Sequence, residues 1–461
     1  MRYTDQFGYQ LTISDKSRLS SWNKTILAFL AHSSKTPQHM TATLQPPVTF
    51  ALGHATLGFF NLLLARKELI EVASLSLQNA EKAAKEEALT DRETCYIAAL
   101  RDWLQGHPSG AADRLDICLK DFPRDALLLK MVHAIRFVLG QPSKMRQSIE
   151  QALPSYDQNH PAWGYVKGCY AFTLEETGDY LLAEHMGREA VEVAPDDAWG
   201  LHAVAHVYDM TGKPSEGIKW LDTHRNSWIH CNNFGYHVWW HQALMYLDNN
   251  DNDRVLDLYD ERVRIDKTDD YRDISNAASL LVRLEIAGVP TGNRWEELAV
   301  FSENRIDDAC NVFADLHYMM CLLGANHLKS ASSLTARMAY TAKHDKTDMA
   351  QITASTGLPI ATGLAAYRDG NYFSAYHNLM HARTTLIDIG GSHAQRDVFE
   401  RLTIEAALRS GLSLEAKSLL NERKKLRSTS DRYAESRFTL AERMSHASSI
   451  MQDETLREKL G

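Results

Sequence analysis

Turn residues recur at nearly regular intervals along this chain of 461 residues. An apolar stretch with helical periodicity leads to a glycine or asparagine, and a small residue often follows five places later, as in "LQGHPSGA" and "ETGDYLLA". The turn positions are Gly106, Gly140, Gly178, Gly212, Asn250, Gly288, Gly324, Gly370 and Gly411. They are separated by 34, 38, 34, 38, 38, 36, 46 and 41 residues, so each interval has room for one pair of helices. Such spacing predicts a stack of helical hairpins.

The positions inside the repeat match the tetratricopeptide (TPR) pattern. Two intervals equal its period of 34 residues, and the others add a short loop. Counted from Gly178, the pattern predicts Ala183 and Ala190 where two helices approach closely, and Pro195 after the second helix; all three are present. We therefore predict an all-α fold, a right-handed α-superhelix of TPR-like helical hairpins.

Three segments are predicted along the chain. Residues 48–425 form a continuous TPR-like α-solenoid, because no long Gly/Ser linker divides them. Residues 1–47 are a polar N-terminal lead-in, with 32–47 as a loop. Residues 426–461 are charged on most faces, which is typical of polar C-terminal capping helices at the end of a solenoid.

The composition of the chain indicates which classes of partner and which cellular compartment to expect. The net charge of −9 has the wrong sign for wrapping a phosphate backbone, so we expect no nucleic-acid partner. No apolar stretch approaches the length of a membrane span, and no signal peptide is visible, so we expect no membrane association. The six cysteines form no C-x-x-C pair, which favours free thiols in a cytoplasmic protein. The oligomeric state stays open.

The repeat frame also assigns the two faces of the first helix in each hairpin. Residues 11, 8, 7 and 4 places before the turn should pack inside the hairpin, and those about 13, 10 or 9, 6 and 3 places before it should line a concave groove. Before Gly212 the groove set is Trp199, His202, His206 and Asp209. Before Asn250 it contains His237 and His241. Before Gly178 it contains Tyr165, Phe172 and Glu175.

A further candidate lies in "LIDIGGSHAQRDVFERL", residues 386–402. Gly390 and Gly391 permit a sharp turn, and Ser392 or His393 can cap a helix that begins near Gln395. A plain loop with a helix cap explains the segment without any function. Arg396 beside a helix N-terminus would also suit an anionic ligand group, so His393 and Arg396 join the candidates, and the segment is a possible lid.

The histidine pairs support several kinds of chemistry. Imidazoles four residues apart on a helix can bind one zinc or iron ion, which makes His202, His206, His237 and His241 candidate metal ligands. The glutamate base of the H-E-x-x-H motif is missing, and Glu175 or Asp209 could complete the coordination instead. Without a metal, acid–base catalysis by His202, His206, His241 or Glu175 is the enzymatic alternative. A third reading is a groove that binds a small polar ligand or a peptide, and a fourth is histidines with a structural role only.

Three stretches resemble one known family when taken together. They are "GYVKGCYAFTLEETGDYLLAEHMGREAVEVAPDDAWGLHAVAHVYDMTGK", "HVWWHQALMYLD" and "GGSHAQRDVF". In this order they are similar to the tetratricopeptide repeat protein 38 family, over about residues 45–425. The resemblance implies an all-helical repeat fold and a soluble protein, and it carries no catalytic residues over to this chain. Ligand binding in the histidine-rich groove is the function we predict.

Overall fold

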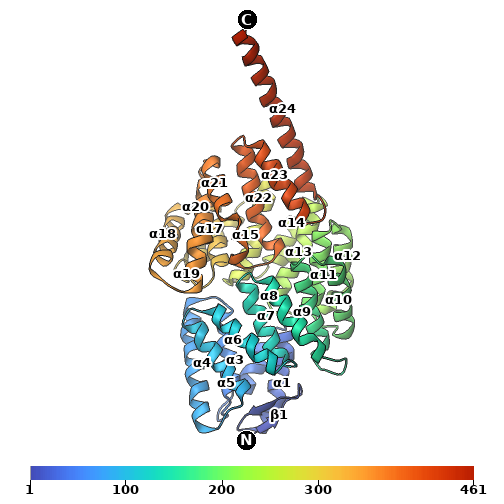
Figure 1. The fold of residues 1–461 in the computed structure, drawn as a ribbon, viewed down its shortest axis with the longest axis vertical. Helices are drawn as coiled ribbons and strands as arrows, with labels where there is room; N and C mark the ends of the chain where they lie inside the picture. The colour runs from blue at the N-terminus through green and yellow to red at the C-terminus, as the bar shows by residue number, and fades with distance from the viewer. Residues whose placement is uncertain (1, 461) are drawn as a thin grey trace.

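Helical hairpins account for most of the computed structural model, which describes residues 2–460, with the side chains of residues 2–446 (Figure 1). Each hairpin pairs two antiparallel helices that are adjacent in sequence. The pairs are α3 (Ala51–Leu62) with α4 (Lys67–Glu86), α5 (Asp91–Leu104) with α6 (Pro108–Asp121), α7 (Ala126–Val138) with α8 (Pro142–Ala152), α9 (Trp163–Glu176) with α10 (Tyr180–Val193), α11 (Ala198–Met210) with α12 (Pro214–Thr223), α13 (Phe234–Asp248) with α14 (Asn252–Leu258), α15 (Tyr271–Ile286) with α16 (Arg294–Glu303), α17 (Val312–Gly324) with α18 (Leu328–His344), α20 (Leu358–Arg368) with α21 (Tyr372–Arg383), and α22 (His393–Arg409) with α23 (Ser413–Leu426). The predicted all-α solenoid of TPR-like hairpins is confirmed.

The predicted turn residues occupy the links between paired helices. Eight of the nine have a positive φ, between 62° at Asn250 and 89° at Gly106, which is the left-handed region that ends a helix without strain at glycine. The prediction at Gly324 is wrong. Gly324 is the last residue of α17, and Asn326, with a φ of 62°, makes the turn instead. A side chain at Gly324 would collide with the Trp295 ring, so this glycine serves close helix packing.

Short elements complete the described chain. The two strands β1 (Arg2–Thr4) and β2 (Gln10–Thr12) pair antiparallel, with Tyr3 opposite Leu11. The remaining short helices are the 3-10 turns η1 (Lys16–Arg18), η2 (Leu153–Ser155), η3 (Arg225–Ser227) and η6 (Leu386–Ile389), the π-helical turns η4 (Tyr259–Val263) and η5 (Thr353–Gly357), and the α-helix α19 (Asp348–Ile352).

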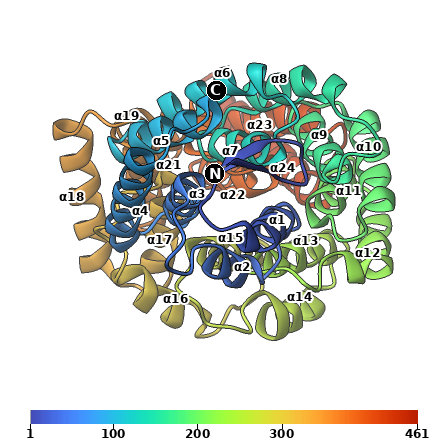
Figure 2. The same cartoon turned by 90° about the horizontal axis from the view of Figure 1, so that it is seen from below.

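The N-terminal segment is more structured than a polar lead-in. It contains α1 (Leu19–Leu30) and α2 (Thr36–Thr43), so the loop predicted over 32–47 is wrong for half of its length. The apolar residues Trp22, Ile26 and Leu30 recur every four places and are buried. This single apolar stripe packs α1 against the rest of the protein. Seen from below, α1 and α2 lie inside the ring that the hairpins form (Figure 2). The segment therefore fills part of the solenoid interior.

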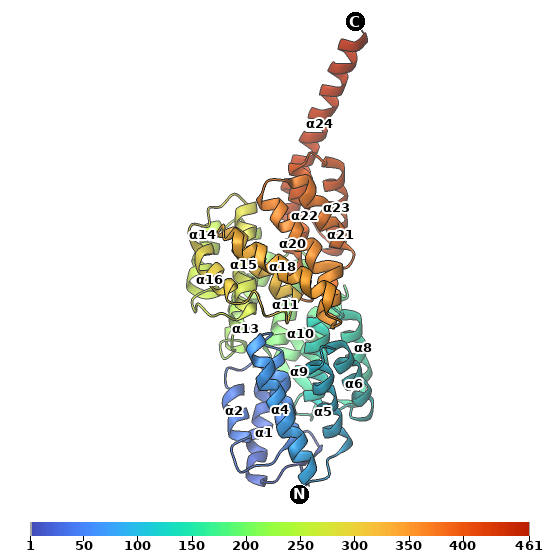
Figure 3. The ribbon, with the colours of Figure 1, turned by 90° about the vertical axis from the view of Figure 1, so that its left-hand side faces the viewer.

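The C-terminal segment is one helix, where we predicted more than one capping helix. This helix, α24 (Arg432–Leu460), packs on α23 at its start and then projects beyond the hairpins (Figures 1 and 3). Tyr433 and Ala441 are buried, so the first turns of α24 belong to the core. Among the described residues, none of the helices is both long and apolar enough to cross a membrane.

Candidate metal centre

Four histidines from two helices direct their Nε2 atoms at one another. α11 supplies His202 and His206, and α13 supplies His237 and His241. The Nε2 atom of His202 lies 2.9 Å from that of His206, 3.0 Å from that of His237 and 3.0 Å from that of His241. The Nε2 atoms of His237 and His241 are 3.2 Å apart. The structure thus brings together the two pairs that the repeat frame placed on one face, and we call these four residues the histidine centre.

Local sequence explains why the helices come close enough for this. A separation of four residues places both imidazoles of each pair on one side of its helix. Glycines let the neighbouring helix approach: a Cβ atom on Gly200 would lie 3.1 Å from the Cα atom of Gly168 in α9. Asp197 caps α11 by accepting hydrogen bonds from the backbone N–H groups of Trp199 and Gly200. These features bring α9, with Phe172 and Glu175, against the histidine centre.

The centre is buried, and burial opposes a positive charge on its imidazoles. His202, His206 and His241 are at most 2% exposed, and His237 is half-buried. Burial lowers the pKa of His237 to about 3, and it lowers the pKa values of His202 and His241 well below 6.5. Burial also acts to lower the pKa of His206, but the Glu175 carboxylate outweighs it and raises that pKa.

Two polar neighbours orient the imidazoles from outside. Nδ1 of His206 lies 3.3 Å from a carboxylate oxygen of Glu175, and Nδ1 of His237 lies 2.9 Å from the side-chain oxygen of Asn276 on α15. An oxygen acceptor at Nδ1 favours the tautomer with the proton on that nitrogen. In the neutral form of His206 and His237, the Nε2 atoms then carry lone pairs that face the middle of the cluster. Carboxylate–histidine and amide–histidine contacts of this kind surround metal ligands in proteins.

The ring nitrogens of the four histidines cannot all be paired in hydrogen bonds with one another. His202 can donate one proton from Nε2, yet three other Nε2 atoms lie within 3.0 Å of it. The Nδ1 atoms of His202 and His241 are buried without a hydrogen-bond partner. Converging lone pairs in a buried site repel one another unless a cation lies between them. The four histidines form a group of ligand atoms that could hold a metal ion.

Aromatic rings enclose the histidines. Phe172 stacks on His202 with ring centroids 5.7 Å apart, and Trp240 stacks on His237 with centroids 5.2 Å apart. Trp199 and Phe234 contact His202 at 5.1 Å each. His32, from the N-terminal segment, stacks on both of these rings in turn. The predicted concave face is thus filled by the chain's own side chains and is not an open groove at this point.

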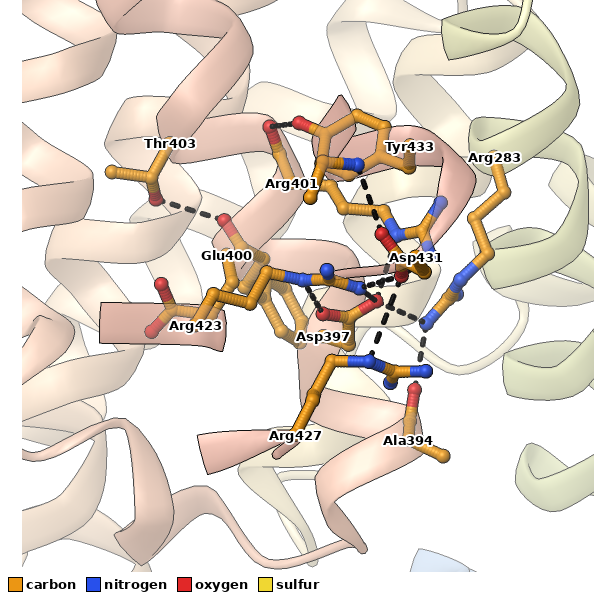
Figure 4. A network of polar contacts seen from close by, with 12 residues as sticks. Arg283, Ala394, Asp397, Glu400, Arg401, Thr403, Arg423, Arg427, Asp431 and Tyr433 are labelled. Carbon is orange, nitrogen blue, oxygen red and sulfur yellow. Dashed lines mark hydrogen bonds and ion pairs between the residues drawn. The ribbon is translucent and has the colours of Figure 1, made fainter. Parts of the chain in front are cut away.

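Other predicted ligand-binding residues have partners elsewhere. The Tyr165 hydroxyl donates to Asp196 over 2.7 Å. Asp209 forms an ion pair with Arg427, with 3.0 Å between the guanidinium and the carboxylate. Arg427 belongs to a second polar cluster (Figure 4). Neither side chain joins the histidine centre, because each is held by a partner that the repeat frame did not reveal.

The 386–402 segment reaches the rear of the centre. Ser392 caps α22 through a capping box with Gln395, and the helix begins at His393, two residues earlier than predicted. The backbone N–H of His393 donates to Glu176 over 2.8 Å, and Arg396 lies 3.2 Å from the other oxygen of the same carboxylate. His393 and Arg396 therefore bind a neighbour of Glu175 and not the centre itself.

Sequence reasoning missed Asn276. It lies twelve residues before the turn at Gly288, between the groove position at about 13 and the packing position at 11. The repeat frame assigns a residue at that place to neither face, so it gives no signal for Asn276. Trp240, by contrast, is one of the aromatic residues that the sequence placed at the ligand-binding surface.

Comparison with known proteins yields only distant likeness. No protein-family model matches the chain. Human IFIT1, solved as a dimer with PPP-AAAA, is 14% identical with a TM-score of 0.43, and the match covers 94% of this chain and 96% of that one. Human IFIT1 with m7Gppp-AAAA is 16% identical with a TM-score of 0.44 and the same coverage. Yeast Tom70 is 14% identical with a TM-score of 0.36, covering 97% of this chain and 99% of that one.

Proposed function

We propose that this protein is a TPR-like repeat protein that binds one transition-metal ion, zinc or iron, at His202, His206, His237 and His241. The observation that supports the proposal is the convergence of four buried Nε2 atoms at separations of 2.9–3.2 Å. Neutral imidazole is a preferred ligand of both metals.

The spacing fits an ion at a normal bond length. The Nε2 atoms of His202, His237 and His241 form a triangle with sides of 3.0, 3.0 and 3.2 Å. A point at equal distance from them in that plane is about 1.8 Å from each, so an ion slightly above the plane reaches the 2.0–2.1 Å typical of metal–imidazole bonds. The outer contacts of Glu175 and Asn276 would then hold two of the four rings in the binding orientation.

Burial of the histidines supports a metal ion over the other ligand classes that the sequence predicts. A peptide needs an accessible groove, whereas three of the four histidines are at most 2% exposed. A metal ion needs no such space. Acid–base catalysis by the His206–Glu175 pair remains the enzymatic alternative, but it gives no role to the other three converging imidazoles. Membership of the tetratricopeptide repeat protein 38 family, a cytoplasmic location and the absence of a nucleic-acid partner stay predictions.

The test is metal analysis of protein purified without a histidine tag. After incubation with zinc or ferrous ion and removal of excess metal, we expect about one ion per chain by mass spectrometry of the metal content. The double variant His202→Ala/His241→Ala should lose the ion. The control His185→Ala, whose side chain is 62% exposed, should retain it.

Two further results separate binding from folding. Circular dichroism should show that the double variant keeps its helical content, and the milder variant His206→Gln should lower the affinity without unfolding. If the wild-type protein and the double variant carry the same amount of metal, the proposal is wrong.

A further inference from the structure

We propose that the metal ion in the histidine centre keeps two adjacent coordination positions free of protein ligands, and that these positions bind a small monoanion through one or two oxygen or nitrogen atoms. The inference rests on the proposed function, because it concerns the geometry of the same site.

The four imidazoles are not equivalent neighbours. The rings of His202 and His241 contact each other, with centroids 4.8 Å apart. Each also contacts the remaining two: His206 lies at 4.3 Å from both, and His237 lies at 4.9 Å from His202 and 4.7 Å from His241. Of the six pairs that these four described residues can form, His206 with His237 is the one whose rings are not in contact. One ring nitrogen of each nevertheless lies within 4.8 Å of the other.

This pattern differs from a closed tetrahedral site. Four ligands at 2.0–2.1 Å in a tetrahedron have six equal nitrogen separations of about 3.3–3.4 Å. In an octahedron, adjacent nitrogens are about 2.8–3.0 Å apart and opposite ones about 4.0–4.2 Å. The three Nε2 separations from His202, 2.9–3.0 Å, match the adjacent value, and the 3.2 Å between His237 and His241 lies between the two geometries. The rings of His206 and His241, which would also be adjacent, are in contact with centroids 4.3 Å apart. His206 and His237 then take opposite positions, with His202 and His241 between them.

Four such ligands leave two corners of an octahedron. One lies opposite His202 and the other opposite His241, and these corners are next to each other because the two histidines are. Metal sites with open positions bind and activate exogenous molecules, whereas closed four-ligand sites are structural. The arrangement therefore favours a reactive or ligand-binding centre over a structural one.

Charge defines the kind of ligand. The four protein ligands are neutral imidazoles, and Glu175 is the carboxylate at ion-pair distance from one of them. The next carboxylate, Glu176, is already paired with Arg396. A divalent ion thus leaves one positive charge uncompensated in a buried, aromatic surrounding, which a monoanion would neutralise. The half-buried His237 marks the side from which a small ion can enter.

Cobalt(II) substitution tests the geometry, with azide and formate as the probes. We expect the tag-free protein with one cobalt ion to show the weak visible absorption of five- or six-coordinate cobalt. Azide should shift these bands with saturation at one per chain, and formate should compete with it. Intense absorption of the tetrahedral type that neither anion changes would overturn the inference and leave metal binding intact. If no cobalt or zinc binds at all, the proposed function itself fails.

The variant Glu175→Gln tests the charge argument at saturating cobalt. Removing the nearby carboxylate makes the centre more positive, so azide should bind at least about threefold more tightly than to the wild-type protein. The control His185→Ala should bind azide as the wild-type protein does. Unchanged or weaker azide binding by Glu175→Gln would contradict a monoanion site.

Discussion

Two clusters of buried polar side chains in this molecule differ in how the loss of hydration is compensated. The histidine centre brings together four imidazoles whose Nε2 atoms face one another. The arginine–aspartate cluster pairs groups of opposite charge from α11, α22, α23 and the link between α23 and α24. Figure 4 shows the part of this cluster that lies on α22, α23 and that link. Its members are Asp209, Asp397, Arg401, Arg423, Arg427 and Asp431. Opposite charges compensate one another within the arginine–aspartate cluster, whereas the histidine centre would be completed by the metal ion that we propose.

Distances within the arginine–aspartate cluster support this difference. Arg423 lies 2.6 Å from Asp397 and 2.6 Å from Asp431, and Arg401 lies 2.7 Å from the second oxygen of Asp397. These side chains are at most 9% exposed. Charge-assisted hydrogen bonds of this length compensate for lost hydration, so this cluster should contribute to stability without any ligand.

Breaking the arginine–aspartate cluster should have the largest effect. Asp431→Ala leaves buried guanidinium groups without their carboxylate, and we expect a loss of about 3–5 kcal/mol in the free energy of unfolding. Urea unfolding at pH 7 measures it. The control Glu81→Ala removes an exposed ion pair with Arg101 and should cost less than about 1 kcal/mol. Equal effects of the two substitutions would show that the buried cluster is not stabilising.

Removing the metal ion from the histidine centre should lower the stability of the folded protein almost as strongly. An ion at 100 to 1,000 times its dissociation constant stabilises the folded state by about 3–4 kcal/mol, so a chelator should lower the melting temperature of the metal-loaded protein. The variant His202→Ala should melt at the same temperature with and without chelator. If a chelator leaves the wild-type melting temperature unchanged, the histidine centre does not depend on a bound ion and the proposed difference between the two clusters is wrong.

Glu175→Gln should have an intermediate effect. The substitution keeps the shape but weakens the hold on His206, and changes at such outer positions reduce metal affinity about 10- to 100-fold. Competition with a chromogenic chelator measures the affinity. Glu192→Gln, at an exposed position of the adjacent helix α10, is the matched control and should leave it unaltered.

Lowering the pH from 7 to 6 should have the smallest effect per residue on the free energy of unfolding. Because burial lowers the pKa values of His202, His237 and His241, the unfolded chain takes up protons first as the pH falls through 6.5. Metal-free protein should therefore lose about 0.7 kcal/mol for each of these histidines between pH 7 and pH 6. Urea unfolding at the two pH values measures the loss, and unchanged stability would mean that the histidines titrate normally in the folded state.

The arginine–aspartate cluster should respond only to stronger acid. Burial by itself would raise the pKa of Asp397, but Arg423 and Arg401 hold it well below 3.8, and Asp431 is lowered in the same way. A carboxylate with a lowered pKa stabilises the fold above its unfolded value and loses that contribution as the pH falls below about 4. Asp431→Ala should therefore flatten the pH dependence below pH 4 and leave the slope between pH 7 and pH 6 unchanged.

The parts of the structure that depend on local spacing were predictable. The turn residues, the paired helices and the shared face of His202, His206, His237 and His241 all follow from a repeat of known period. Contacts that cross the solenoid were not predictable. Asp209 occupies the groove position that the frame assigns, but its partner Arg427 is 218 residues away in sequence. The helix α1 was missed because its short apolar stripe lies outside the repeat.

The contacts of the N-terminal segment also set an order for synthesis. The backbone N–H of Asn232 donates to the carbonyl of His32 over 2.9 Å, and that of Ser34 donates to the carbonyl of His230 over 3.1 Å. The segment that holds His32 and Ser34 therefore cannot complete these contacts until 196 further residues have been translated. Because His32 stacks on Trp199 and Phe234, the enclosure of the histidine centre is completed only after those later residues have been made.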